Sequence, residues 1–116
     1  MKNTYLHNPR CSKSRQGIAL LEEKNISFTI KEYLKDPLTK AELSKLYTLL
    51  KKKYAVKEFT RTKEKLFKEN GLSIDSIGKK DSWVKCILEN PVLIERPILY
   101  NDKSATIGRP PEDLIK

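Results

Sequence analysis

Hydrophobic and polar residues follow two different periods in the first thirty residues of this chain. Residues 3–6 form a short first strand that contains the apolar pair Tyr5 and Leu6, residues 12–24 have the apolar spacing of a helix, and residues 26–31 alternate as a strand does. The apolar positions are Ile18, Leu20 and Leu21 in the helix and Ile26, Phe28 and Ile30 in the second strand. Asn25 marks the helix stop. The pattern predicts a βαβ unit, with parallel strands and a right-handed crossover.

The middle of the chain, about residues 36–90, has the pattern of helices. Thr39 and Glu42 form a capping box, and apolar residues then recur at helical spacing. A second helix is predicted over Val56–Lys68 with a stop at Asn70–Gly71, and a third follows Asp81 and ends before Pro91. The predicted buried positions are Leu43, Leu46, Tyr47 and Leu50, then Phe59 and Phe67, then Trp83, Val84, Ile87 and Leu88.

The last 25 residues indicate a hairpin. Residues 92–100 read as a strand interrupted at Arg96-Pro97, residues 101–103 as a turn, and residues 104–107 as the returning strand. Pro97 belongs at a strand start or an edge, and residues 111–115 begin a short helix. The sequence thus predicts an α/β fold with a four-stranded mixed sheet and a helical insertion.

Composition narrows the class of protein. The 116 residues suffice for one domain with a modest core. No apolar run approaches the roughly 20 residues of a membrane span, and residues 1–4 lack the apolar stretch of a secretory signal. Two cysteines, Cys11 and Cys86, are too few for a disulfide scaffold and fit no metal-ligand spacing. We therefore expect a cytoplasmic protein with no membrane association and no bound metal.

The net charge of +9 is concentrated in residues 51–70, which hold eight Lys or Arg and three Glu. Such a segment can contact nucleic acid or an acidic protein, and it can equally be a solvated helix face, which is the commoner case. Its aromatic residues are Tyr54, Phe59 and Phe67, and the two phenylalanines fit the apolar side of a helix. Nucleic-acid binding is therefore not expected.

Cys11 stands directly before the first predicted helix, in a polar and cationic stretch. The unpaired backbone N–H groups of residues 13–15 and the positive end of the helix dipole favour a thiolate there. The same groups can hold a bound oxyanion. The residues of this anion-binding loop are Ser12, Lys13, Ser14 and Arg15. A lone cysteine is more often a buried apolar side chain, and residue chemistry alone leaves that alternative open.

Three motifs in order resemble the glutaredoxin-dependent arsenate reductase family, which has a thioredoxin-like fold. They are His7-Asn8-Pro9-x-Cys11-x-x-Ser14-Arg15, Leu93-Ile94-x-Arg96-Pro97-Ile98 and Ile107-Gly108-Arg109-Pro110. The resemblance covers essentially the whole chain and implies one thioredoxin-like domain over residues 1–116, with the insert at about 36–90. It implies that Cys11 attacks arsenate, that Arg96 and Arg109 bind the oxyanion, and that Pro97 follows a cis peptide bond. Arg61 matches the third arginine more loosely, by its place in the predicted insert helix, and His7 matches a histidine that favours the thiolate.

The resemblance further implies glutathione as co-substrate and glutaredoxin as partner, with no bound cofactor. Ser14 occupies the position where a Cys-x-x-Cys motif has its second cysteine, which agrees with an external resolving thiol. Two alternatives stay open. One is an Spx-type regulator that binds RNA polymerase, although that switch uses Cys-x-x-Cys. The other is a glutathione-dependent thiol reductase with no role for an oxyanion.

Overall fold

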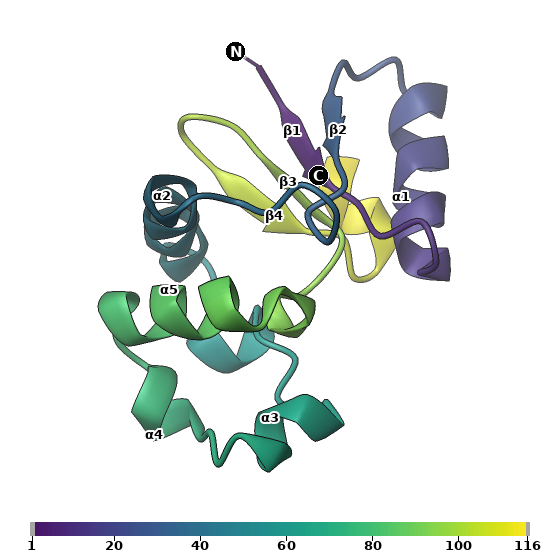
Figure 1. Cartoon of the computed structure of the whole chain (residues 1–116). Coiled ribbons are helices and arrows are strands. Elements are labelled where there is room, and N and C mark those ends of the chain that lie inside the picture. Colours follow the sequence, from purple (N-terminus) through teal and green to yellow (C-terminus); the bar gives the residue numbers. More distant parts are fainter. Residues whose placement is uncertain (1, 116) are drawn as a thin grey trace. The chain divides into compact units, whose positions relative to one another are not determined.

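The computed structural model describes residues 2–115. They divide into two compact units, one formed by residues 2–36 with 96–115 and the other by Pro37–Glu95 (Figure 1). The bounds of the second unit lie close to those predicted for the helical insert. The organisation as one domain with an insert stays a prediction.

The first unit contains a four-stranded mixed sheet in the order β2-β1-β3-β4. The strands are β1 (Thr4–Leu6), β2 (Thr29–Lys31), β3 (Ile98–Tyr100) and β4 (Ala105–Ile107). β1 pairs with β2 in parallel, and β3 pairs with both β1 and β4 in antiparallel fashion. The predicted βαβ unit, C-terminal hairpin and α/β class are confirmed, although each strand is only three residues long.

One face of this sheet is covered by α1 (Ser12–Glu23) and the short helical turn η3 (Pro111–Ile115), which lie beside one another in Figure 1. Tyr5, Leu21 and Leu114 form the centre of this layer, with Ile18, Ile26, Phe28, Leu99 and Ile115 packed around them. Ile30, an apolar position of the alternating strand pattern, is 46% exposed. β2 is an edge strand, so the helix layer that covers Tyr5 in β1 does not reach Ile30 in the neighbouring register position.

The second unit is helical. It contains α2 (Lys40–Lys51), η1 (Val56–Glu58), α3 (Lys65–Glu69), α4 (Ile74–Ile77), α5 (Lys80–Glu89) and η2 (Pro91–Leu93). The predicted capping box of Thr39 and Glu42 is confirmed at the start of α2. In the core of this unit, the rings of Tyr47, Phe59 and Trp83 contact one another, and Trp83 Nε1 donates to Thr60 Oγ1 at 2.9 Å.

Three predictions for this unit were wrong. The helix over Val56–Lys68 is broken into η1 and α3, because residues 59–61 pair with residues 93–95: Arg61 N–H donates to Leu93 O and Glu95 N–H to Phe59 O. The strand predicted from Val92 begins only at Ile98, since residues 91–93 form a 3-10 turn. Leu88 is 43% exposed, and the buried face of α5 consists of Trp83, Val84, Cys86 and Ile87.

Between residues 2 and 115, none of the helices combines the length and the apolar character needed to cross a lipid bilayer.

Candidate active site

Cys11 is the N-cap residue of α1, as its sequence position predicts. A tight turn leads into the helix, because the Cys11 N–H donates to Asn8 O at 2.9 Å. The Cys11 carbonyl accepts the first helical hydrogen bond, from the Arg15 N–H at 3.1 Å. The sulfur is only partly buried, so it stands at the positive end of a twelve-residue helix and within reach of solvent.

Several donors converge on the Cys11 sulfur. Burial by itself raises the pKa of this thiol, but hydrogen bonds from the Ser14 N–H, the Arg96 guanidinium and the Lys13 N–H, together with the charge of Arg96, lower it below its ordinary value. Arg109 Nη2 lies 3.8 Å from Sγ as a further donor. Because the thiolate is the nucleophilic form, this arrangement favours a reactive sulfur.

The two arginines reach the sulfur from the open end of the β3–β4 hairpin. Arg96 precedes β3 and Arg109 follows β4, and each is joined to the next residue, Pro97 or Pro110, by a cis peptide bond. The Arg109 Nε–H donates to Arg96 O at 2.8 Å, which holds the two segments together. Two planar, permanently charged guanidinium groups beside one thiolate form a site suited to a tetrahedral oxyanion.

The side chain of Ser14 points away from the predicted anion site and toward His7 and Asn8. It is fully buried, its Oγ accepts a hydrogen bond from the Asn8 N–H at 3.1 Å, and a hydrogen bond of 2.7 Å joins it to His7 Nδ1. Only the backbone N–H of Ser14 faces the sulfur. Ser14 therefore contributes one donor to the site and uses its hydroxyl to fix the loop that precedes Cys11.

His7 is buried and acts on the same loop. Burial, and the positive charge of Arg15, lower its pKa, while Glu32 opposes them with a smaller effect than burial. The imidazole is thus neutral at pH 7. His7 can support the Cys11 loop through Ser14, but it does not supply a positive charge to the thiolate.

The remaining residues of the predicted anion loop divide into two groups. Ser12, Lys13 and Arg15 all have exposed side chains. Arg15 Nη1 donates to Pro9 O at 2.7 Å, so this guanidinium braces the loop. The expectation that the Arg15 N–H is free to bind an anion was wrong, because that group donates to Cys11 O within the helix.

Arg61 belongs to the second unit. It lies between η1 and α3 and forms an ion pair with Glu64, so the insert helix that suggested its match to the family is absent at this position. The first unit brings together Cys11, Ser14, Arg96 and Arg109, with His7 behind Ser14. Any role for Arg61 stays a prediction.

Sequence reasoning missed two residues that shape the site, Tyr5 and Gly17. The Tyr5 hydroxyl is buried and donates to Ser14 O at 2.6 Å, and burial raises the pKa of Tyr5 to about 12. A Cβ at Gly17 would clash with that hydroxyl oxygen. A glycine inside a helix destabilises it by about 1 kcal/mol relative to alanine. A glycine within the predicted helix is therefore a sequence signal that another group packs closely against the backbone there.

Within residues 2–115 the structure shows no group of His, Cys, Asp and Glu side chains placed to hold a metal ion. The second thiol, Cys86, is buried in α5. Burial raises the pKa of Cys86, and the negative charge of Glu89 raises it further. This thiol has the features of a structural residue.

A family model, curated relatives and solved structures all show that this chain is similar to arsenate reductases. The model of a family described as the ArsC family matches residues 6–116. An arsenate reductase of Haemophilus influenzae is 40% identical over 113 residues, covering 95% of this chain and 93% of that protein. A solved structure of an arsenate reductase from Vibrio cholerae superposes with a TM-score of 0.87 and 40% identity, covering 99% of this chain and 96% of that one. This likeness confirms the thioredoxin-like four-stranded fold.

A relative with a different role is also similar. The global transcriptional regulator Spx 1 of Oceanobacillus iheyensis is 30% identical over 105 residues, which is 90% of this chain and 78% of that protein. Related sequences therefore occur in at least two functional classes.

Proposed function

We propose, from the premise that this chain belongs to the ArsC family, that it is an oxidoreductase that reduces arsenate with Cys11 as the nucleophile. One observation carries the proposal: two arginine side chains and two backbone N–H groups surround a thiol whose pKa is lowered. A plain structural cysteine has no need of such a cluster. Oxyanion chemistry needs both the thiolate and the cations.

In the first step the Cys11 thiolate attacks arsenic. A sulfur–arsenic bond forms and an arsenic–oxygen bond breaks. The departing hydroxyl group of arsenate takes up from solvent the proton that the thiol released when it ionised, and it leaves as water. Arg96 and Arg109 hold the remaining arsenate oxygens through paired N–H donors. Fixed cations stabilise the charge that accumulates on these oxygens in the transition state without reorganising.

In the second step glutathione resolves the adduct. Its sulfur bonds to the Cys11 sulfur, the electron pair of the sulfur–arsenic bond stays on arsenic, and the glutathione proton passes to an arsenic oxygen. Arsenic(V) thereby becomes arsenic(III) and leaves as arsenite, while the two sulfurs are oxidised to a disulfide. Ser14 in place of a second loop cysteine supports an external thiol.

Glutaredoxin then reduces the Cys11–glutathione disulfide and returns the thiol. No bound cofactor takes part. We place the protein in the cytoplasm because the cycle consumes reduced glutathione, which that compartment maintains.

The test combines intact-mass measurement with a coupled assay. Cys86→Ser protein incubated with arsenate and glutathione should acquire one glutathione, and omission of arsenate should prevent it. The same protein should support arsenate-dependent NADPH consumption with glutathione, glutathione reductase and glutaredoxin, and Cys11→Ser should not. Reduction of a glutathione mixed-disulfide substrate, with no arsenate-dependent glutathionylation of Cys11, would point to a plain thiol reductase instead.

The same assay also tests Arg61. If the resemblance extends to this residue, Arg61→Lys should lower arsenate turnover while leaving the alkylation rate of Cys11 unchanged.

A second candidate, a non-enzymatic regulator that contacts RNA polymerase, is favoured by the similarity to Spx 1. Residues 51–70 supply a basic segment for such a contact, and all but one of its cationic side chains are exposed. Co-purification with polymerase that is lost when Lys51, Lys52 and Lys53 are replaced by Glu, together with absence of arsenate turnover, would favour this reading.

A further inference from the structure

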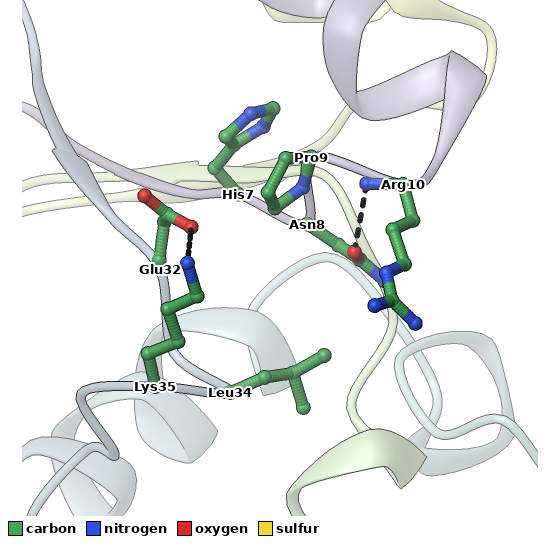
Figure 2. Close-up of a pocket in the computed structure, with 7 residues that line it drawn as sticks. All are labelled: His7, Asn8, Pro9, Arg10, Glu32, Leu34 and Lys35. Atoms are coloured by element: carbon green, nitrogen blue, oxygen red, sulfur yellow. Dashed lines mark hydrogen bonds and ion pairs between the residues drawn. The ribbon is translucent and has the colours of Figure 1, made fainter.

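A cavity of about 390 Å³ lies in the first unit, beside the loop that leads to Cys11 (Figure 2). Its volume falls within the roughly 300–1,000 Å³ of small-molecule sites. Two short segments line it: His7, Asn8, Pro9 and Arg10 from one, and Glu32, Leu34 and Lys35 from the other. No step assigned to arsenate uses this cavity.

The position of the cavity follows from the sheet. β1 and β2 are parallel, Leu6 pairs with Lys31, and the His7 N–H donates to Lys31 O at 3.0 Å. The segments that line the cavity therefore leave the carboxyl ends of two neighbouring parallel strands. Ligands of open α/β sheets bind in the crevice outside such ends.

The cavity also borders the chain segment that leads to the nucleophile. Asn8, Pro9 and Arg10 immediately precede Cys11, and the turn that contains them is closed by the hydrogen bond from the Cys11 N–H to Asn8 O. A molecule held against Arg10 therefore contacts the residue that immediately precedes Cys11 in the chain.

The lining carries both signs of charge and one apolar side chain. Arg10 and Lys35 are exposed cations from the two different segments. Glu32, in the same segment as Lys35, adds a carboxylate to the lining. Lys35 Nζ lies 3.7 Å from Glu32 Oε1, and their side chains are 81% and 40% exposed, so this ion pair is weak and open to exchange. Leu34, 44% exposed, is one of three large apolar side chains that the described residues present to solvent.

A simple oxyanion would need the cations alone. A ligand that also uses Glu32 and Leu34 must carry an ammonium group and some apolar length, which describes a small zwitterionic peptide. Figure 2 shows the Arg10 side chain near one end of the labelled set and Glu32 and Lys35 near the other, with Leu34 reaching between them. This spread of groups suits an extended molecule.

We infer that this cavity binds the resolving thiol as a peptide of the glutathione class. Its carboxylates contact Arg10 and Lys35, its ammonium group contacts Glu32, and its chain lies over Leu34. This inference rests on the proposed function, because it locates the co-substrate of the second step.

The binding test uses S-methylglutathione, whose sulfur cannot react. Amide chemical shifts of the labelled protein give the dissociation constant and the location together. We expect shifts in residues 7–10 and 32–35, and Lys35→Glu should weaken binding at least about tenfold. The matched control is Lys103→Glu, which makes the same change in net charge at an exposed lysine of the β3–β4 turn and should leave the dissociation constant within about twofold.

A second pair of measurements tests the ammonium contact. Acetylating the amino group of S-methylglutathione should weaken binding to the unaltered protein. Glu32→Gln should weaken binding of the parent ligand and hardly affect the acetylated one. Equal losses from Lys35→Glu and Lys103→Glu, shifts that map elsewhere, or no binding up to about 10 mM ligand would overturn the site.

These results are separable from the proposed function. Binding of S-methylglutathione needs no arsenate, so a protein that binds it at this cavity but never reacts with arsenate keeps the site and loses the reaction. A protein that reduces arsenate with the same KM for glutathione in both lysine variants keeps the reaction and loses the site.

Discussion

Cys11 and Cys86 are both cysteines associated with helices, but their surroundings shift the pKa of the thiol in opposite directions. Both sulfurs are desolvated, which raises the pKa of any thiol. Cys11 caps the start of α1, where backbone N–H groups and Arg96 overcome that effect. Cys86 lies inside α5, where the N–H groups are already used by the helix and the negative charge of Glu89 raises the pKa of the thiol further.

The contrast teaches that position on a helix, and not the thiol itself, decides reactivity. A helix start exposes unpaired donors, and a helix interior does not. The two arginines then add what the helix cannot, two planar charges beside the sulfur.

The largest expected difference between the two thiols is in alkylation rate. With neutral iodoacetamide at pH 7, Cys11 should react at least about 100-fold faster than Cys86, because its thiolate is favoured and its sulfur is accessible. Mass spectrometry of the two cysteine peptides over time measures both rates in one sample. In denaturant the rates should converge to within about threefold. A Cys86 that reacts as fast as Cys11 in the folded protein would remove the basis of the comparison.

The next effect separates charge from geometry at Cys11. Arg96→Lys and Arg109→Lys keep the positive charge but lose the planar fork, and each should slow arsenate turnover at least about tenfold, which is a loss of roughly 1.4 kcal/mol of transition-state stabilisation. Alkylation of Cys11 by the neutral reagent should change far less. Equal losses in both reactions would mean that the arginines support only the thiolate or the fold.

A smaller effect concerns the helix start that holds Cys11. Gly17→Ala should destabilise the protein by about 1 kcal/mol net, since the clash with the Tyr5 hydroxyl outweighs the usual gain of alanine in a helix. Urea unfolding measures this change in the free energy of unfolding. In a Tyr5→Phe background the penalty should shrink, because the oxygen that meets the new Cβ is gone. A stabilising Gly17→Ala in the unaltered background would contradict the close contact.

The smallest effect is the pH dependence that His7 gives to the Cys11 region. His7 is the only histidine of the chain, and burial lowers its pKa in the folded state. Near pH 6.5 the imidazole of His7 therefore binds a proton more readily in the unfolded chain than in the folded protein. The free energy of unfolding should fall as pH drops below that value, with a slope of at most about 1.4 kcal/mol per pH unit. Urea unfolding of the wild type and of His7→Asn between about pH 7 and pH 5.5 measures the difference. A wild type and variant with parallel pH profiles would argue against a buried neutral His7.

The sequence by itself determined the local features of this protein. Apolar periodicity located α1 and the parallel pairing of β1 with β2, and the capping box located the start of α2. The place of Cys11 at a helix N-terminus followed from the polar turn before it. These features depend on neighbours a few residues apart, so their signal is contained in short stretches of sequence.

Only the tertiary structure decided the features that depend on distant partners. Residues 56–68 have a helical pattern, but pairing of residues 59–61 with 93–95 and the Trp83–Thr60 hydrogen bond break it. Ser14 has its hydroxyl turned inward to His7, which its place in the loop motif does not reveal. Arg109 reaches Cys11 across 98 positions of sequence. No local pattern encodes such contacts, because they arise from how the sheet and its loops pack in space.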